Sequence, residues 1–142
     1  MKLSRAVGYA LVALVRLARQ QEETAPLTSG KIVLATGLSE KYLLKALQPL
    51  AKARVLRSLK GPHGGYTLAR PARNIFLLEV VEAVDGPLRG EVPRWGGSED
   101  LDRRLDQVCQ EAALGLRDYL RGISLAELAD GQKPRRKKGE GK

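Results

Sequence analysis

The residues around one glycine-rich turn have the chemistry to bind a negatively charged partner. The stretch KGPHGGYTLARP, residues 60–71, holds three glycines and a proline at positions 61–65. Glycine lets the backbone take a positive φ and approach another surface, and cations beside it are attracted to the negative potential of a DNA minor groove. The cationic or polar neighbours are Arg57, Lys60 and His63. Taken alone, such a turn is more simply interpreted as a tight hairpin with solvated charges.

Catalysis and metal binding have much weaker signals. Cys109 and His63 are the only cysteine and the only histidine, so one chain can form neither an internal disulfide nor the usual zinc ligand cluster. The sequence has no Walker-type phosphate loop and no nucleophile with a matching base. We therefore predict that the chain is not an enzyme and that it has no catalytic residue, no cofactor and no metal site.

The charge balance favours a polyanionic partner. The 142 residues are enough for one domain with a hydrophobic core and a projecting element. The net charge is +9, from 25 lysines and arginines against 16 aspartates and glutamates, and the tail 131–142 contributes +5 of it. The remaining +4 is enough to favour a polyanion. For the tail we predict disorder, with nonspecific phosphate binding and a solubilising role as the two open interpretations.

The N-terminal stretch has the charge pattern of a signal peptide, but it is better interpreted as a core helix. A positive start precedes the apolar residues Ala6 to Val15, which Arg16 ends, and no small-residue cleavage site follows. The apolar stretch is also too short to span a bilayer. Together with the lone cysteine, this pattern predicts a protein of the reducing cytoplasm without membrane association.

Helical periodicity followed by a hairpin predicts a winged helix. Apolar residues recur at three- and four-residue steps in three successive segments, which predicts three helices. Ser4 and Ser39 are the predicted caps of the first and third helices. Thr28 precedes the second helix, and Gly37 is its predicted stop. A turn of about three residues joins the second and third helices, which is the helix-turn-helix arrangement. The segments VLRSLK and YTLAR flank GPHGG and predict the two strands of a wing.

A long helix is predicted after the wing, and its apolar seam predicts a dimer. Leu77 to Val84 forms a short amphipathic helix that Gly86 and Pro87 end, and Ser98 can cap the long helix. Apolar or small residues alternate along it at four- and three-residue steps, which suits packing on another helix: Leu101, Leu105, Val108, Ala112, Gly115 and Tyr119. Packing within one chain is the alternative. A small winged-helix body could hardly cover so long a seam, so we expect a second copy.

These elements define the expected fold class and division of the chain. The fold is mainly α with a small β-hairpin, and a capping box in SLAE predicts a last short helix. We predict a winged helix-turn-helix DNA-binding domain over residues 1–86, a loop and dimerisation helices over 87–130, and the basic tail over 131–142.

One long stretch combines several motifs of a known family. IVLATGLSEKYLLKALQPLAKARVLRSLKGPHGGYTLARP opens a helix with a YL pair and ends the hairpin with GGY. It resembles the Rrf2 family of bacterial winged-helix transcription regulators. The resemblance also takes in MKLSRAVGYALVALVRLA, IFLLEVVEAVDGP and ISLAELAD. It implies a regulator, here expected to be a repressor, that binds double-stranded DNA as a homodimer on a palindromic operator, with recognition helices in successive major grooves and wings in flanking minor grooves.

The resemblance also assigns candidate DNA contacts. Those on the recognition helix are Ser39, Lys41, Tyr42 and Lys45, and those in or near the wing are Arg57, Ser58, Lys60, Gly61 and His63. Residues near helix starts are candidate phosphate contacts: Lys2, Ser4, Arg5 and Thr28. For the Tyr42 ring, packing on the hairpin is an equal alternative.

Three positions depart from the family pattern. Lys60 stands where many relatives carry arginine. The ammonium group of lysine is a point charge, whereas the planar guanidinium of arginine can donate two parallel hydrogen bonds, so a bidentate base contact is less expected here. Arg54 stands where a glycine commonly closes the recognition helix, so it takes a left-handed conformation or the helix ends differently. Pro49 removes a backbone donor within that helix, which predicts a kink or a late helix start.

Several family members bind an iron-sulfur cluster through three cysteines between the post-wing helix and the dimer helix. The matching segment GPLRGEVPRWGGSEDLDRRLDQVCQ holds only Cys109. Because free cysteine is often buried, we interpret Cys109 as a packing residue and predict DNA binding without a metal or cluster. A redox-active bridge or a two-cysteine site between two chains is the alternative.

Two other functions stay open from the sequence alone. A winged-helix adaptor would use the hairpin and the long helix to dock a protein, and it would show no salt-sensitive binding to duplex DNA. A DNA-binding regulator could also sense thiol redox state or a small molecule near Trp95, although one tryptophan in a loop is interpreted here as packing. The sequence does not identify an effector.

Overall fold

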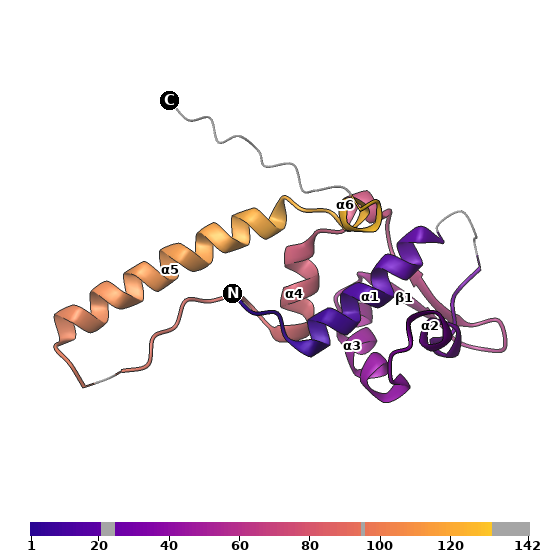
Figure 1. Ribbon diagram of the computed structural model, residues 1–142, viewed down its shortest axis with the longest axis horizontal. Helices are drawn as coiled ribbons and strands as arrows, with labels where there is room; N and C mark the ends of the chain where they lie inside the picture. The colour runs from indigo at the N-terminus through magenta and orange to yellow at the C-terminus, as the bar shows by residue number, and fades with distance from the viewer. Residues whose placement is uncertain (21–24, 95, 132–142) are drawn as a thin grey trace, which may run out of the picture.

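The computed structural model describes residues 1–20, 25–94 and 96–131. Within these ranges the chain forms six α-helices, one short 3-10 helix and a two-stranded antiparallel sheet. Figure 1 shows a body of short helices with a hairpin, from which one long helix projects. The expected fold class, a mainly helical winged helix with a long C-terminal helix, is confirmed. Of the tail predicted as disordered over residues 131–142, all but residue 131 lies outside the described residues, as does Trp95.

Helix α1 (Arg5–Arg19) forms the centre of the body. The Ser4 hydroxyl accepts a hydrogen bond from the Val7 amide at 3.2 Å, which caps the helix as predicted. One face of α1 is fully buried and contacts α2, α3, α4 and α6. Burial of a single leucine such as Leu14 stabilises the fold by about 1.5–3 kcal/mol. Helix α1 therefore links four of the other helices through its apolar face.

The helix-turn-helix consists of α2 (Ser29–Thr36) and α3 (Glu40–Lys52). Gly37 ends α2 in a left-handed conformation with φ of 71°, which is the predicted stop. Helix α3 begins at Glu40 and includes Pro49, so the alternative of a late helix start is wrong. Arg54 adopts the left-handed conformation, with φ of 59°, and lets the chain turn into the hairpin.

The hairpin pairs β1 (Leu56–Leu59) with β2 (Gly65–Leu68) in antiparallel register. Leu27, just before α2, joins this sheet through two backbone hydrogen bonds with Tyr66, at 3.1 and 2.8 Å. A side chain at Gly65 has no room, because its Cβ would lie 2.4 Å from the Leu27 carbonyl oxygen, and φ there is 143°. The wing is therefore tied to the start of the helix-turn-helix.

The second half of the chain leaves the body and returns to it. A 3-10 turn (Ala72–Asn74) leads into α4 (Leu77–Asp85), and after a loop α5 (Glu99–Arg121) extends away from the body (Figure 1). Helix α6 (Leu125–Ala129) then packs on α1, and Ser124 forms a β-bridge with Phe76. The division at residue 86 stays a prediction, since α6 lies in the same core as α1.

No helix within the described ranges is both long and apolar enough to cross a membrane.

Candidate nucleic-acid interface

The recognition helix and the wing belong to one stretch of sequence without negative charge. From Lys41 to Leu78 the chain has eight basic residues and no acidic residue. This stretch covers nearly all of α3, the whole hairpin and the 3-10 turn. The missing carboxylates leave its positive charges uncompensated along the chain, which favours contact with a polyanion. Sequence reasoning missed this signal, although counting charges along the chain would have found it.

Helix α3 presents a polar stripe to solvent. Lys41 and Lys45 are exposed, while Leu43, Leu47 and Leu50 are buried on the opposite side. The stripe continues through two residues that sequence reasoning missed, Gln48 and Lys52, at the next helical steps. Ser39 is exposed before the helix, and its hydroxyl makes no capping bond, so the hydroxyl is available to a ligand. A glutamine or lysine in such a stripe has the donors and acceptors to read base edges in a major groove.

Tyr42 has a ring partner in α1 rather than in the hairpin. Its ring stacks on Tyr9, with centroids 6.1 Å apart and an interplanar angle of 26°. The stack fixes the start of α3 against α1. Since Tyr42 remains 53% exposed, its outer side is still available for contact. The alternative role in packing thus exists, but on another element than the sequence suggested.

The wing is an exposed, basic hairpin tip. Arg57, Ser58, Lys60 and His63 are all exposed. Gly61 has φ of 103°, and its carbonyl accepts a hydrogen bond from the Gly64 amide at 2.9 Å, which closes the tip. Figure 1 shows this tip at the end of the body away from the projecting α5. The geometry fits a narrow element that enters a groove.

A shallow groove of about 410 Å³ connects the recognition helix with the wing. It is lined by Gln48, Ala51 and Lys52 of α3 and by Ser58 and Tyr66 of the hairpin. The exposed stripe of α3 and the wing are therefore adjacent parts of one surface, which we call the α3–wing surface.

The candidate phosphate contacts near helix starts differ in availability. Lys2 and Arg5 are exposed at the start of α1. The Ser4 hydroxyl already caps α1 and donates a hydrogen bond to Asp85 Oδ1 at 2.7 Å, so a phosphate there would meet a carboxylate. The Thr28 hydroxyl accepts from the Lys31 amide at 3.2 Å, and Thr28 lies next to the wing through Leu27.

An ion pair ties the end of the wing to α4. Arg70 follows β2, and its guanidinium pairs with the Glu79 carboxylate while also donating to the Asn74 carbonyl at 2.7 Å. The hydrogen bond to Glu79 raises the pKa of Arg70 above its ordinary value. The other oxygen of Glu79 accepts from the Phe76 amide at 3.3 Å, so the start of α4 is fixed as well. The base of the wing is therefore rigidly oriented.

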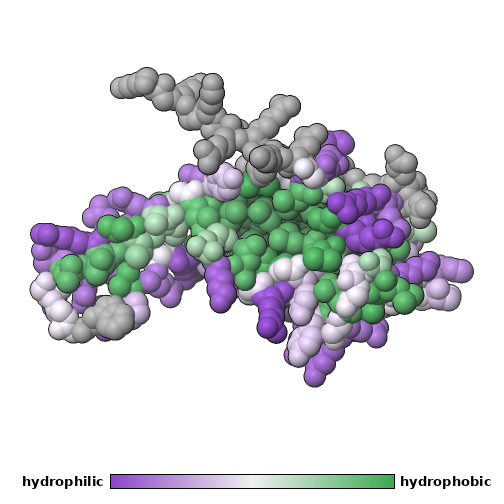
Figure 2. Space-filling view, viewed as in Figure 1, coloured by the Kyte–Doolittle hydropathy of each residue, from purple (hydrophilic) through white to green (hydrophobic). Residues whose placement is uncertain are grey.

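Helix α5 exposes the whole apolar seam that the sequence singled out. Val108 is 61% exposed, and the other members of the seam, Leu101, Leu105, Ala112, Gly115 and Tyr119, are exposed too. Figure 2 shows hydrophobic residues gathered along the projecting helix and over the adjoining body. Within the described residues none of these six residues is buried, so packing within one chain leaves much of the seam uncovered.

Cys109 lies beside the seam and is half-buried. Within the described ranges no group of three or more histidine, cysteine, aspartate or glutamate side chains could hold a metal ion, so Cys109 has no set of neighbouring ligands there.

Comparisons with known proteins agree with this geometry. The family model Rrf2, described as an iron-dependent transcriptional regulator, matches residues 3–131. Rv1287 of Mycobacterium tuberculosis, which carries the name of an HTH-type transcriptional regulator, is 31% identical over 141 residues, covering 94% of this chain and 84% of that protein. The HTH-type transcriptional regulator IscR of Xenorhabdus nematophila is 32% identical over 137 residues, covering 93% of this chain and 81% of that protein.

Solved structures share the fold. The structure of IscR from T. potens has a TM-score of 0.70 and 27% identity, over 93% of this chain and 89% of that one. The structure of CymR, the global cysteine regulator of B. subtilis, has a TM-score of 0.74 and 24% identity, over 94% of this chain and 99% of that one. Because the family model matches nearly the whole described chain, the protein belongs to the Rrf2 family of winged-helix, DNA-binding transcription regulators.

Proposed function

We propose that the protein is a repressor that binds a palindromic operator as a homodimer. Helix α3 enters the major groove, and the wing contacts the flanking minor groove. The observation that carries this proposal is the α3–wing surface, where Lys41, Lys45, Arg57 and Lys60 are exposed and no acidic residue intervenes. Bound in this way, a dimer spans two successive major grooves and excludes other proteins from that DNA.

Roles within this surface follow from side-chain chemistry. Lys41, Lys45, Gln48 and the outer side of Tyr42 face the bases or the adjacent phosphates, because they line the exposed side of α3. Lys60 and His63 at the wing tip contact the minor groove, where their cationic or polar groups meet a negative potential. Arg57, Ser58 and the backbone at Gly61 contact phosphates, as do Thr28, Lys2 and Arg5 at helix starts.

The second copy pairs along α5. The exposed seam from Leu101 to Tyr119 supports this pairing, because apolar side chains at alternating four- and three-residue steps fit a partner helix. Burying such a seam favours association through the hydrophobic effect. The seam is separate from the α3–wing surface, so dimerisation leaves the DNA contacts free (Figure 1).

Iron is not expected to take part in DNA binding. The family model is described as iron-dependent, but the residues of this chain do not fit a cluster held by several thiolates. Cys109 is the only cysteine, and its carbonyl and neighbouring backbone are covered by the loop at Gly90. We accordingly derive no step through iron. We also propose a cytoplasmic protein without enzymatic activity, since its relatives are named as transcription regulators.

Genomic DNA affinity selection with the purified full-length protein tests the proposal. Fragments recovered at low salt and eluted with rising salt are sequenced, and the expected result is a shared imperfect palindrome. Fluorescence anisotropy on that palindrome should then show an affinity that falls steeply with salt, because bound lysines and arginines release counterions from phosphates. Failure to retain any fragment at low salt would contradict DNA binding, and a motif without two-fold symmetry would contradict the homodimer.

A further inference from the structure

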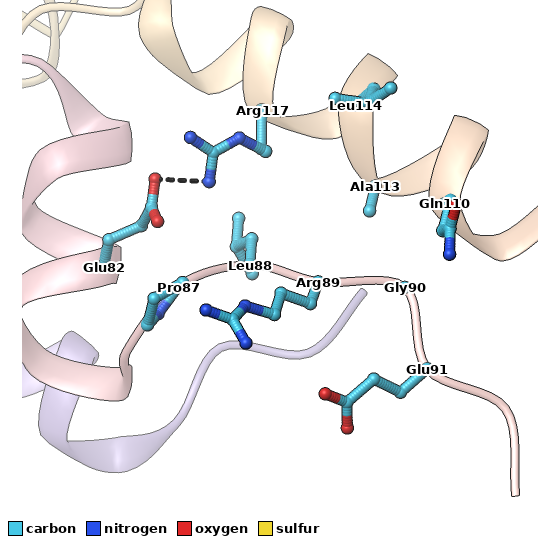
Figure 3. Close-up of a pocket in the computed structure, with 10 residues that line it drawn as sticks. All are labelled: Glu82, Pro87, Leu88, Arg89, Gly90, Glu91, Gln110, Ala113, Leu114 and Arg117. Carbon is cyan, nitrogen blue, oxygen red and sulfur yellow. Dashed lines mark hydrogen bonds and ion pairs between the residues drawn. The ribbon is translucent and has the colours of Figure 1, made fainter.

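A second concave surface lies far from the α3–wing surface, between α4, α5 and the loop that joins them. Figure 3 shows this hollow, which has a volume of about 670 Å³. Leu88, Ala113 and Leu114 supply apolar walls, while Arg89, Gln110 and Arg117 supply polar groups. Ligand pockets for small organic molecules typically have about 300–1,000 Å³ and this mixture of apolar walls and few polar groups. We call it the α4–α5 pocket.

The floor of the pocket is fixed by a close backbone contact. A Cβ at Gly90 would lie 2.1 Å from the Cys109 carbonyl oxygen and 2.2 Å from its carbonyl carbon, so only glycine fits between the loop and α5. The loop therefore lies directly on the helix backbone, and no side chain at position 90 fills the space beside Leu88. A pocket held open in this way needs little rearrangement to accept a ligand.

The charges in the pocket favour a carboxylate. Arg117 Nη1 pairs with Glu82 Oε1 at 2.7 Å, and the two side chains are only 26% and 22% exposed. Arg89 lines the same pocket and has no ion-pair partner within the part of the chain that the structure describes. Figure 3 shows the two guanidinium groups on either side of the Leu88 side chain. Each guanidinium has five N–H donors, so donors remain for an incoming carboxylate.

Two carboxylates in the lining of the pocket limit the ligand to a single negative charge. Glu82 and Glu91 also border the pocket, and a second anionic group on the ligand would be repelled by them. The apolar walls in turn favour a hydrocarbon part. The matching chemical class is a small monocarboxylate with a short apolar portion.

The pocket adjoins a line of ion pairs that leads to the wing. Glu82 lies three residues after Glu79 on α4, and so on the same face of the helix. Glu82 pairs with Arg117, and Glu79 pairs with Arg70, which follows β2. One face of α4 is thereby bonded both to Arg70, at the end of the wing, and to Arg117 of α5. A carboxylate that binds the remaining donors of Arg117 shares its charge with Glu82 and so weakens the ion pair between α5 and α4. On a helix of about 3.6 residues per turn, Gln110 and Arg117 lie roughly opposite the dimer seam, so a partner helix on the seam does not itself cover them.

We propose that the α4–α5 pocket is an effector site for a small monocarboxylate with an apolar portion, and that its occupation changes the affinity of the protein for DNA. The second half of this statement rests on the proposed function, while ligand binding itself does not. Coupling between two sites of one protein commonly changes affinity by about 5- to 150-fold.

Titration of the full-length protein with hexanoate, followed by ¹H–¹⁵N NMR spectra, tests binding without any DNA. Hexanoate should bind saturably and shift the amide signals of residues 88–91 and 110–117. Acetate, which lacks the apolar part, and 1-hexanol, which lacks the charge, should both bind at least about tenfold more weakly. Absence of saturable hexanoate binding overturns the proposal, as does equal binding of 1-hexanol.

Two arginine variants make the test specific. Arg89→Gln removes a charge from the pocket, and Arg94→Gln removes an exposed charge from the same loop outside the pocket. We expect Arg89→Gln to weaken hexanoate binding about tenfold and Arg94→Gln to leave it unchanged. Equal behaviour of the two variants contradicts the assigned site.

Anisotropy on the selected operator, with and without saturating hexanoate, then tests coupling. Operator affinity without hexanoate is measured first, so a failure of DNA binding itself is recognised separately. A change of about fivefold or more supports the effector role. Hexanoate that binds in the NMR titration without altering operator affinity overturns that role.

Discussion

At the scale of single residues, one charge at the wing tip can be removed without disturbing the fold. Lys60 is exposed and has no ion-pair partner among the described residues. We expect Lys60→Ala to weaken operator binding roughly tenfold and to reduce the salt slope by about two, one for each copy of Lys60 in the dimer. Arg103→Ala, an exposed position on α5, is the control and should bind normally. Anisotropy over a salt series measures both, and a loss of the dimer in Lys60→Ala, seen by light scattering, would contradict the separation of the two surfaces.

Two glycines of the wing distinguish two reasons why alanine would destabilise the fold there, a positive φ and a lack of space for a Cβ. Gly61 and Gly65 both have positive φ, but a Cβ at Gly61 meets nothing within 4 Å, whereas one at Gly65 meets the Leu27 carbonyl. Gly61→Ala should therefore cost about 1 kcal/mol of unfolding free energy, and Gly65→Ala about 3 kcal/mol. Urea unfolding of the two variants measures the difference. Equal losses would mean that the link between Leu27 and the wing adds no constraint.

At the scale of elements, α5 exposes the apolar seam from Leu101 to Tyr119 on one face. A charge in the middle of that seam should prevent pairing, since two copies would bury like charges near each other. We expect Val108→Glu to be a folded monomer with operator affinity lowered by at least about a hundredfold, because each half then binds alone. Gln107→Glu adds the same charge at an exposed position of α5 outside the seam and should remain dimeric. Light scattering and circular dichroism distinguish the outcomes, and a dimeric Val108→Glu would disprove the assigned interface.

At the scale of the whole molecule, the iron dependence of the family is expected to be missing. Protein purified without oxygen should contain no stoichiometric iron, and Cys109→Ala should bind the operator with unchanged affinity. An iron-sulfur cluster needs several thiolate ligands, and each chain has one cysteine. Iron analysis, visible absorption and anisotropy measure this. Stoichiometric iron that disappears in Cys109→Ala together with operator affinity would reverse the conclusion.

The sequence predicted those parts of the fold that depend on neighbours along the chain. Ser4, Thr28 and Ser98 cap their helices with hydroxyl groups, and Gly37 stops α2, because capping needs only residues within a turn. The ring partner of Tyr42, the contact of Gly90 with Cys109 and the return of α6 to α1 could not be predicted, since each joins segments distant in sequence. The candidate DNA contacts were assigned through motifs and stay predictions, and Gln48 and Lys52 were not among them because no motif marks them.

In the proposed dimer, the length of α5 would set the spacing between the two DNA-binding surfaces. Its 23 residues extend over about 34 Å at roughly 1.5 Å per residue. One turn of B-DNA, the distance between successive major grooves on one side, is about 34–36 Å. Where two such helices pair side by side, their length sets the distance between the two bodies, and so the phase of the half-sites on the double helix. Operators whose half-sites are moved apart by half a DNA turn would place one recognition helix on the wrong side of the duplex.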